Sequence, residues 1–176
     1  MNRFERVSRF PDAVLPVRKT ANSAGYDLTV AEDICVPPVI NHIKALDSEY
    51  TTYISTFDLK ETAALTKATG AKPTLVSTGV KCQLDPGCYL ELSVRSSTPL
   101  KYWLILANSV GIIDSDYYNN PDNEGEIFLQ LINLSPYNIQ LHKGDVIGQG
   151  IIKKYEITDD DNATGNRLGG FGSTSK

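Results

Sequence analysis

Asp85-Pro-Gly-Cys-Tyr-Leu-Glu-Leu-Ser-Val94 contains a turn followed by a strand. Proline fixes its own φ angle and glycine adopts angles that other residues avoid, so the first three residues favour a tight turn. From Tyr89 to Val94 polar and apolar side chains alternate, which is the period of a strand with one buried face. This stretch therefore predicts a β-strand that packs one face against a core.

The same pattern of short apolar or alternating runs between turn signals occurs along most of the chain. Many short strands at near-regular spacing are typical of an all-β sandwich or barrel, so the predicted fold class is mostly β. The predicted strands are residues 14–17, 26–30, 34–36, 75–84, 89–94, 103–107, 111–113, 127–133, 138–141 and 146–155.

Two helices are predicted among these strands. The stronger candidate covers residues 58–70, where Asp58 can cap the first turn and Gly70 ends the helix ahead of Pro73. A shorter helix is predicted to begin with Pro99, because the first helical position does not need the N–H group that proline lacks.

Length and composition fit one domain with a polar tail. A chain of 176 residues can bury a proper core, and we assign residues 1–157 to a single domain. From residue 158 onward Asp, Asn, Thr, Gly and Ser dominate, so residues 158–176 are predicted to form a flexible arm until a ligand binds them. The formal net charge of −4 argues against stable nucleic-acid binding.

The cysteines and the N-terminus indicate the cellular compartment in which the protein is expected. Cys35, Cys82 and Cys88 are odd in number and lack CxxC spacing, so they predict neither a zinc site nor a disulfide scaffold. Reduced thiols in a cytoplasm-like compartment are the expectation. The N-terminus has no apolar signal core and no run approaches membrane-spanning length, so we expect a cytoplasmic protein without membrane association.

A candidate catalytic carboxylate lies in Gly111-Ile-Ile-Asp-Ser-Asp-Tyr117, where an apolar run ends in two acids and a tyrosine. A carboxylate at a strand end can act as a general base by holding a water against an electrophile, and Asp114 is the candidate. The same residue types also form ordinary turns, so the segment alone fits a turn capped by Asp114 and Asp116.

Two further segments can grip an anion. Arg95-Ser-Ser-Thr98 offers a guanidinium beside three hydroxyls, which are groups that hold phosphate oxygens. Arg167-Leu-Gly-Gly-Phe-Gly-Ser-Thr174 offers a cation, a ring and hydroxyls on a backbone that can approach a ligand closely. A polar loop and an inert linker are the alternatives. Since an Arg and a lone Phe have no structural role in a polar tail, we favour closure of the tail over a ligand.

In chain order, five segments resemble the five motifs of the homotrimeric dUTPases, and the resemblance covers residues 14–36 and 75–176. Each motif alone is weak, whereas five in order are specific. The resemblance implies a dUTPase-like jelly-roll or β-clip barrel with one short helix, an extra inserted strand and helix segment, and a flexible C-terminal arm. The segments are Ala24-Gly-Tyr-Asp-Leu28, Arg95-Ser-Ser97, Gly111-Ile-Ile-Asp-Ser-Asp-Tyr117, Gly144-Asp-Val-Ile-Gly-Gln149 and Arg167-Leu-Gly-Gly-Phe-Gly-Ser-Thr174.

The resemblance implies hydrolysis of dUTP to dUMP and pyrophosphate, with Mg²⁺ bound to the triphosphate. Asp114 would then orient the attacking water on the α-phosphate. Tyr117 would lie under the deoxyribose and leave no room for a 2′-OH. The contacts that the resemblance implies for the pyrimidine are Asn108, Ile112, Ile113 and Phe128.

The resemblance also implies phosphate contacts, an arm and a metal contact. The arm of a neighbouring chain would close over each site of a homotrimer, because the sites of this family lie between subunits. Asp27 would reach Mg²⁺ through a water, since Mg²⁺ keeps most of its waters. The implied phosphate contacts are Arg95, Ser96, Ser97, Gln149 and, toward the γ-phosphate, Arg167. The implied contacts of the arm are Phe171, stacked on the uracil, and Gly172, Ser173 and Thr174 over the phosphates.

Two insertions depart from the family pattern. Residues 40–74 add a strand-like run at 50–55 and the candidate helix, and we interpret them as added packing in preference to a partner-binding platform. Residues 118–124 lengthen a hairpin tip and replace the Arg that usually follows the motif's tyrosine. Loop tips tolerate insertions, so we expect retained activity with altered local contacts.

Two alternative functions remain open. The dCTP deaminases share this fold but need a glutamate on the strand after the hairpin, where this chain has Gln130. An amide cannot shuttle protons, so deamination is disfavoured. The other alternative is a phage or mobile-element dUTPase that also binds a regulator protein through its insertions.

Overall fold

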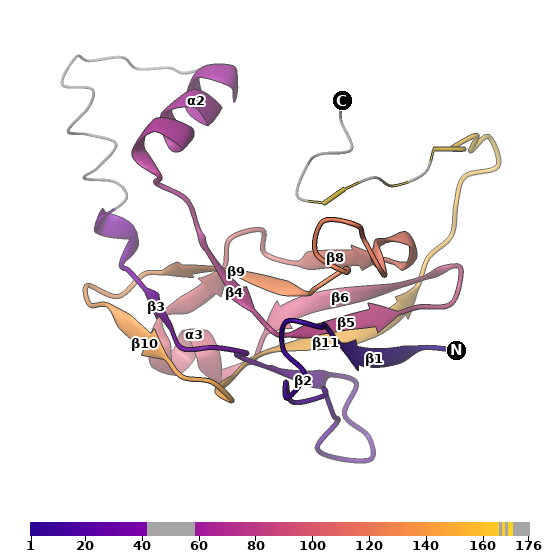
Figure 1. Ribbon diagram of the computed structural model, residues 1–176, viewed down its shortest axis with the longest axis horizontal. Helices are drawn as coiled ribbons and strands as arrows, with labels where there is room; N and C mark the ends of the chain where they lie inside the picture. Colours follow the sequence, from indigo (N-terminus) through magenta and orange to yellow (C-terminus); the bar gives the residue numbers. More distant parts are fainter. Residues whose placement is uncertain (42–58, 166, 168, 171–176) are drawn as a thin grey trace.

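The computed structural model describes residues 1–41, 59–165, 167, 169 and 170. The strand predicted at 50–55 and the helix cap predicted at Asp58 lie outside these residues. Strands dominate the regular structure, as the sequence predicts (Figure 1). The strands are β1 (Arg3–Arg6), β2 (Tyr26–Thr29), β3 (Ile34–Val36), β4 (Thr74–Ser77), β5 (Val80–Gln83), β6 (Cys88–Val94), β7 (Leu104–Leu106), β8 (Gly111–Asp114), β9 (Phe128–Asn133), β10 (Ile139–Leu141) and β11 (Val146–Lys154).

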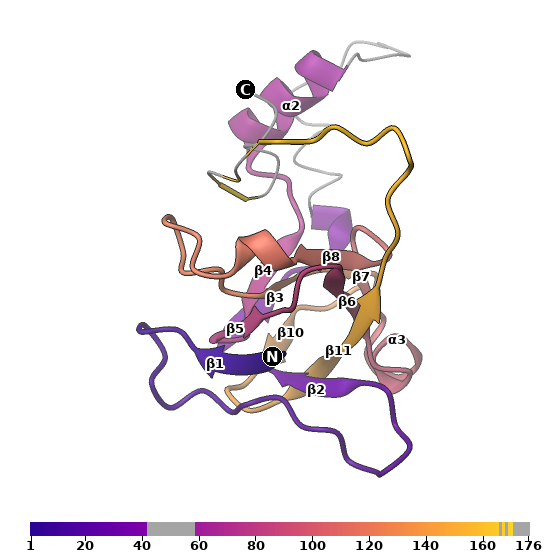
Figure 2. The ribbon, with the colours of Figure 1, turned by 90° about the vertical axis from the view of Figure 1, so that its right-hand side faces the viewer.

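The described strands form small antiparallel sheets that wrap around a shared interior (Figures 1 and 2). The largest sheet has the order β2-β11-β6-β8, and a second has the order β4-β9-β7. The remaining strands pair as β1 with β5 and β10 with β3. Strand β8 lies at the edge of the largest sheet, so one side of its backbone pairs with β6 and the other does not pair within that sheet.

The core forms between the inward faces of these sheets. Along β6 burial alternates as predicted, with Leu90 and Leu92 buried and their polar neighbours partly exposed. Strand β9 alternates in the same way, with Leu129 and Leu131 buried in one cluster with the β6 leucines. Deleting such a buried side chain typically costs about 2–5 kcal/mol, so these strands hold their neighbours firmly in place.

The prediction of one continuous strand over residues 75–84 is wrong, because this segment forms two separate strands, β4 and β5. Between them Gly79 has φ +68°, which favours glycine. A Cβ on Gly79 would lie 2.8 Å from the Cβ of Ala13 and 2.9 Å from that of Phe10. The turn therefore needs glycine both for its backbone angle and for space.

Two other strand predictions also need correction. Residues 14–17 form no strand, and Val17 makes only an isolated bridge with Asp27. The N-terminal strand β1 was not predicted, since Arg-Phe-Glu-Arg has a single apolar residue to show its period. Its register with β5 brings Phe4 opposite Cys82, so the N-terminus is tied to the body of the fold.

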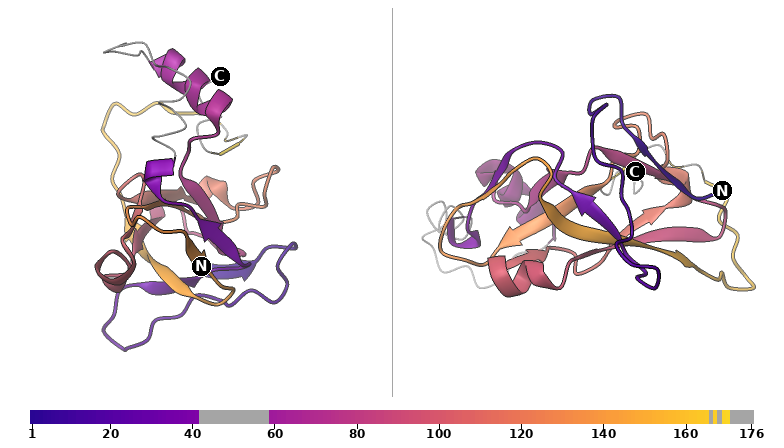
Figure 3. Two further views of the ribbon diagram at one scale, coloured as in Figure 1. Left: turned by 90° about the vertical axis from the view of Figure 1, so that its left-hand side faces the viewer. Right: turned by 90° about the horizontal axis from the view of Figure 1, so that it is seen from below.

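Helix α2 (Leu59–Thr69) confirms the predicted helix, and Gly70, which follows its last residue, has φ +68°. The helix has no buried residue among those described, and it projects away from the sheets in Figures 1 and 2 and in the left view of Figure 3. The interpretation of residues 40–74 as added packing stays a prediction, because residues 42–58 lie outside the described residues. The chain after β11 rises on the same side of the sheets as α2 (Figure 2).

Helix α3 (Ser97–Tyr102) begins earlier than predicted, which places Pro99 in its third position rather than its first. Proline is tolerated there because the first turn of a helix leaves its N–H groups without intrahelical partners. Ser96 occupies the N-cap position but makes no capping bond through its hydroxyl.

The three cysteines are free thiols. Cys35 is exposed, whereas Cys82 and Cys88 are buried. Burial raises the pKa of the Cys82 thiol to about 12. No helix in the described part of the chain is long and apolar enough to cross a membrane.

Candidate functional site

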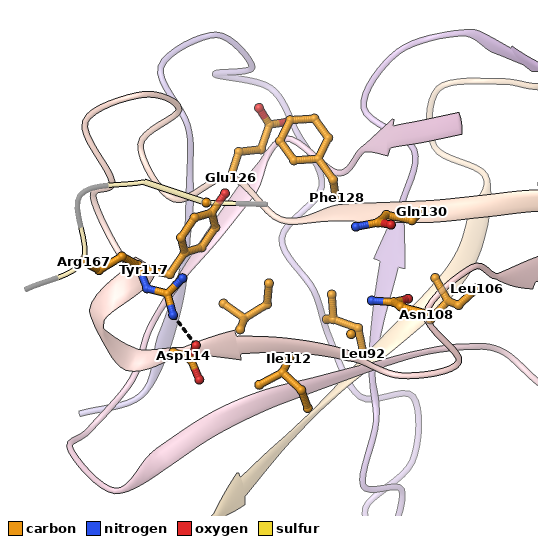
Figure 4. A pocket seen from close by; sticks show the side chains of 13 residues that line it. Leu92, Leu106, Asn108, Ile112, Asp114, Tyr117, Glu126, Phe128, Gln130 and Arg167 are labelled. Atoms are coloured by element: carbon orange, nitrogen blue, oxygen red, sulfur yellow. Dashed lines mark hydrogen bonds and ion pairs between the residues drawn. The ribbon is translucent and has the colours of Figure 1, made fainter. Parts of the chain in front are cut away.

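A cavity of about 200 Å³ opens beside β8, the 3₁₀ helix η1 (Ser115–Tyr117), β9 and the C-terminal tail (Figure 4). It brings together residues that are far apart in the chain. Among the residues predicted for a site, those that line it are Asn108, Ile112, Ile113, Asp114, Tyr117, Phe128 and Arg167.

Charged groups gather at one end of this cavity. The Arg167 guanidinium forms an ion pair with Asp114 Oδ2, and its Nε donates to Asp116 Oδ1 at 2.7 Å. The same guanidinium lies 5.8 Å from the centre of the Tyr117 ring (Figure 4). A single arginine therefore links the carboxylate proposed for catalysis to the aromatic ring beside it.

The Tyr117 side chain is held from several directions and is only 5% exposed. Asn123 Nδ2 donates to its hydroxyl at 2.7 Å. A Cβ built on Gly170 would lie 2.9 Å from the edge of the ring, so the backbone of the tail lies directly against it. Burial raises the pKa of the Tyr117 hydroxyl, and the hydroxyl stays protonated at neutral pH.

Amide side chains line the opposite end of the cavity. Asn108 follows β7, and Gln130 projects from the partly exposed face of β9 (Figure 4). Ile112 and Leu92 lie between the amides and the charged end (Figure 4). The cavity thus has an apolar middle with hydrogen-bonding groups at both ends, which suits a flat ring that carries polar edges.

Glu126 and Gln130 line the cavity but were not predicted as site residues. Glu126 is 4% exposed and accepts a hydrogen bond from the Gly79 N–H at 3.1 Å. Both residues could have been predicted from the alternation of a strand, because residues two positions apart lie on the same face. Glu126 and Gln130 are two positions before and after Phe128, which was predicted to face the site.

Three of the other predicted residues, Asp27, Arg95 and Gln149, form a second cluster around β2, β6 and β11. Ser96 and Ser97 lie at the start of α3. Gln149 pairs in register between Asp27 and Ser93, and its Nε2 donates to Ser93 Oγ at 3.1 Å. Arg95 Nε lies 3.4 Å from Asp27 Oδ1. A Cβ on Gly25 would meet Gln149 Oε1 at 2.4 Å, so this amide fits against the backbone only because residue 25 is glycine.

The two clusters lie at opposite ends of β6. Asp114 pairs with Tyr89 near the start of this strand, whereas Arg95 follows its last residue. At about 3.3 Å per residue, the six steps from Tyr89 to Arg95 span about 20 Å. Asp114 and Arg95 of one chain therefore cannot touch the same phosphate group.

Asp27 is the predicted metal contact. Its side chain is 12% exposed, and its Oδ2 has no hydrogen-bond partner among the described residues. A buried carboxylate oxygen without a partner is costly and fits a water or a hydrated cation. Within the described ranges no three His, Cys, Asp or Glu side chains group as a metal cage. The site fits an ion that keeps most of its waters.

The predicted arm contacts Phe171, Gly172, Ser173 and Thr174 lie outside the described residues.

Known proteins resemble this chain over nearly all of its length. A family model described as dUTPase matches residues 49–175. The deoxyuridine 5′-triphosphate nucleotidohydrolase of Lactococcus lactis is 35% identical, with 97% of this chain and 95% of that protein covered. The crystal structure of the dUTPase from Streptococcus mutans has a TM-score of 0.69 at 35% identity, with 89% of this chain and 98% of that chain covered.

A more distant likeness bears on the fold alone. A mutant dUTPase from phage phi11 of S. aureus, whose structure reveals the coordination of a structural Mg(II) ion, has a TM-score of 0.61 at 16% identity. The match covers 93% of this chain and 96% of that chain. Together these likenesses confirm the expected dUTPase-like β barrel. On the family model and the Lactococcus relative, this chain belongs to the dUTPase family.

Proposed function

We propose that this chain hydrolyses dUTP to dUMP and pyrophosphate, with the cavity beside β8 as the nucleoside pocket. One observation carries the proposal. A carboxylate, a buried tyrosine ring and two amides surround a single cavity, in the order that a phosphate, a sugar and a base occupy in a nucleotide.

Asp114 is the proposed general base. It would hold a water in line with the α-phosphorus and accept its proton as the new P–O bond forms. The bond from the α-phosphorus to the bridging oxygen breaks, and pyrophosphate leaves. Arg167 pairs with Asp114 of its own chain, whereas in the proposed trimer the Arg167 of a neighbouring chain would reach the phosphate chain.

The base and the sugar are proposed to bind along β8 and Tyr117. Since β8 is an edge strand, one of the two neighbours Ile112 and Ile113 turns its backbone N–H and C=O away from β6, where they can pair with the edge of the uracil. Phe128 and Asn108 would border the same ring. The Tyr117 ring would lie under the deoxyribose and exclude a ribose 2′-OH by shape.

The phosphates are proposed to bind the second cluster, on another copy of the chain. Arg95, Gln149 and the hydroxyls of Ser96 and Ser97 are typical phosphate ligands. Because this cluster is about 20 Å along β6 from Asp114, a complete site requires two chains. A homotrimer with three shared sites, closed by residues 158–176 of a neighbouring chain, satisfies this requirement.

Mg²⁺ bound to the triphosphate would neutralise part of its charge and fix the geometry of the phosphates. Asp27 is the residue that we propose to reach its hydration shell, through the oxygen that has no partner in the described part of the chain. Arg95 holds the other oxygen of Asp27 and so orients the carboxylate.

Deamination of dCTP is not proposed. Gln130 lies in the pocket where a deaminase would need a carboxylate to move protons. Its amide can hydrogen-bond to a base but cannot take up a proton at neutral pH.

The proposed activity is tested by measuring pyrophosphate release from dUTP, dCTP, dTTP and UTP with Mg²⁺ present. We expect rapid release from dUTP and weak release from the other three. Equal release from UTP and dUTP would contradict the assigned role of Tyr117, and no release from dUTP would refute the proposed function.

The shared site is tested by mixing two inactive variants, Arg95→Ala and Asp114→Asn. Each alone lacks one end of every site, whereas randomly mixed trimers regain a complete site at about a quarter of positions. We therefore expect co-refolded chains to recover about a quarter of the normal turnover. Mixtures as inactive as the separate variants would show that each chain carries its own complete site.

A further inference from the structure

The hairpin tip inserted at residues 118–124 is tied to the body of the fold at both ends. The Tyr118 hydroxyl donates to Glu5 Oε2 at 2.7 Å. At the other end the Ser8 N–H donates to Glu124 Oε1 at 3.1 Å. Lys81 Nζ donates to Asn119 Oδ1 at 2.6 Å, and the Lys81 side chain is only 11% exposed. The tip is therefore a fixed structure that can hold a neighbouring group in place.

Asn123 is the residue through which this tip contacts the pocket. Its Oδ1 accepts a hydrogen bond from the Gly125 N–H at 3.0 Å, which leaves its Nδ2 to donate to the Tyr117 hydroxyl at 2.7 Å. The carbonyl of Asn123 accepts from the Glu126 N–H at 3.0 Å. With both ends of its amide and its carbonyl engaged, Asn123 has a defined position and orientation.

The residue after the tip reinforces this geometry. Gly125 has φ +77°, and a Cβ there would lie 2.3 Å from the carbonyl oxygen of Tyr117. The backbone therefore folds tightly against η1, and the side chain of Asn123 is brought back to the hydroxyl of Tyr117.

The Tyr117 ring must keep one orientation to separate two sugars by shape. Its contacts with Arg167 and Gly170 come from the tail. The contact at its hydroxyl comes from Asn123 on the fixed tip. A hydrogen bond at the hydroxyl resists rotation about the Cα–Cβ bond, because that rotation displaces the hydroxyl. Rotation about the Cβ–Cγ bond leaves the oxygen in place, and the contacts of Arg167 and Gly170 with the ring resist it.

We propose that Asn123 is a positioning residue for sugar selection, because it holds the Tyr117 ring where a ribose 2′-OH would collide with it. This inference rests on the proposed function and gives the inserted tip a role in it. The tip then takes part in specificity without touching the substrate.

Asn123→Ala is expected to lower the ratio of kcat/KM for dUTP to kcat/KM for UTP by about tenfold, the value of one hydrogen bond of about 1.4 kcal/mol. Tyr117→Phe removes the same bond from its other side and is expected to lower the ratio to a similar extent. The double variant should be no worse than either single one, because the two changes remove one interaction.

Two further variants separate positioning from general disturbance of the tip. Asp122→Ala changes the adjacent exposed side chain and should leave both rates unchanged. Asn123→Asp should keep most of the selectivity, because a carboxylate can accept from both the Gly125 N–H and the Tyr117 hydroxyl.

The inference is overturned if Asn123→Ala lowers both rates equally and leaves their ratio intact, or if its effect adds to that of Tyr117→Phe. If Asn123→Ala does not fold, the ratio of kcat/KM for dUTP to kcat/KM for UTP in Tyr117→Phe and Asn123→Asp tests the inference instead. If the unaltered chain fails to hydrolyse dUTP, the proposed function itself is contradicted. A failure of the proposed function can therefore be distinguished from a failure of the inference about Asn123.

Discussion

Asp114→Asn is expected to abolish pyrophosphate release from dUTP while nucleotide binding persists. A positioned general base typically contributes about 10²–10⁴-fold, and an amide of the same shape can hold a water but cannot accept its proton. Steady-state pyrophosphate release measures the loss, and calorimetric titration with dUTP measures the binding that remains.

The matched control is Asp116→Asn. Asp116 is a more exposed carboxylate and contacts Arg167 as Asp114 does, so this variant changes the same ion-pair cluster without touching the proposed base. A modest effect is expected. Unchanged turnover in Asp114→Asn, or an equal loss in both variants, would remove the catalytic role assigned to Asp114.

Truncation after Asp161 is expected to cut turnover severely and to leave the fold intact. It removes Arg167 and Gly170, which lie against Asp114 and the Tyr117 ring, together with the predicted arm contacts at 171–174. The last described strand ends at Lys154, and among the described residues none of the buried hydrophobic core comes from beyond it. Turnover of dUTP and thermal unfolding, measured together, distinguish a lost arm from a lost fold.

Arg167→Ala in the full-length chain separates the charge of the arm from its backbone. If Arg167 reaches the phosphates, this single change should reproduce much of the loss caused by truncation. A truncated chain with full activity would rule out closure by the arm.

Strands could be predicted best where the alternation of apolar and polar residues in the sequence matches the alternation of buried and exposed side chains. Strand β6 could be predicted because its leucines alternate with polar residues and face the core. The break at Gly79 was missed, since the alternation of residues 75–84 continues through the turn and only the tertiary contacts to Ala13 and Phe10 show it. β1 has too few apolar residues to show a period.

The residues proposed for the site could be named from motifs, but their grouping could not. Motif order gives no sign that Asp114 and Arg95 lie at opposite ends of β6, because that follows from the register of β8 against it. The hydrogen bond from Asn123 to Tyr117 was equally hidden. It depends on the path of an inserted tip for which the family pattern offers no counterpart.

The free-standing position of α2 bears on how this chain can change over generations. A helix without buried residues is under little selection from the core, so substitutions at its most exposed positions, such as Leu59, leave the free energy of unfolding of the barrel nearly unaltered. New length or new surface chemistry can accumulate in this region while the catalytic body stays constant.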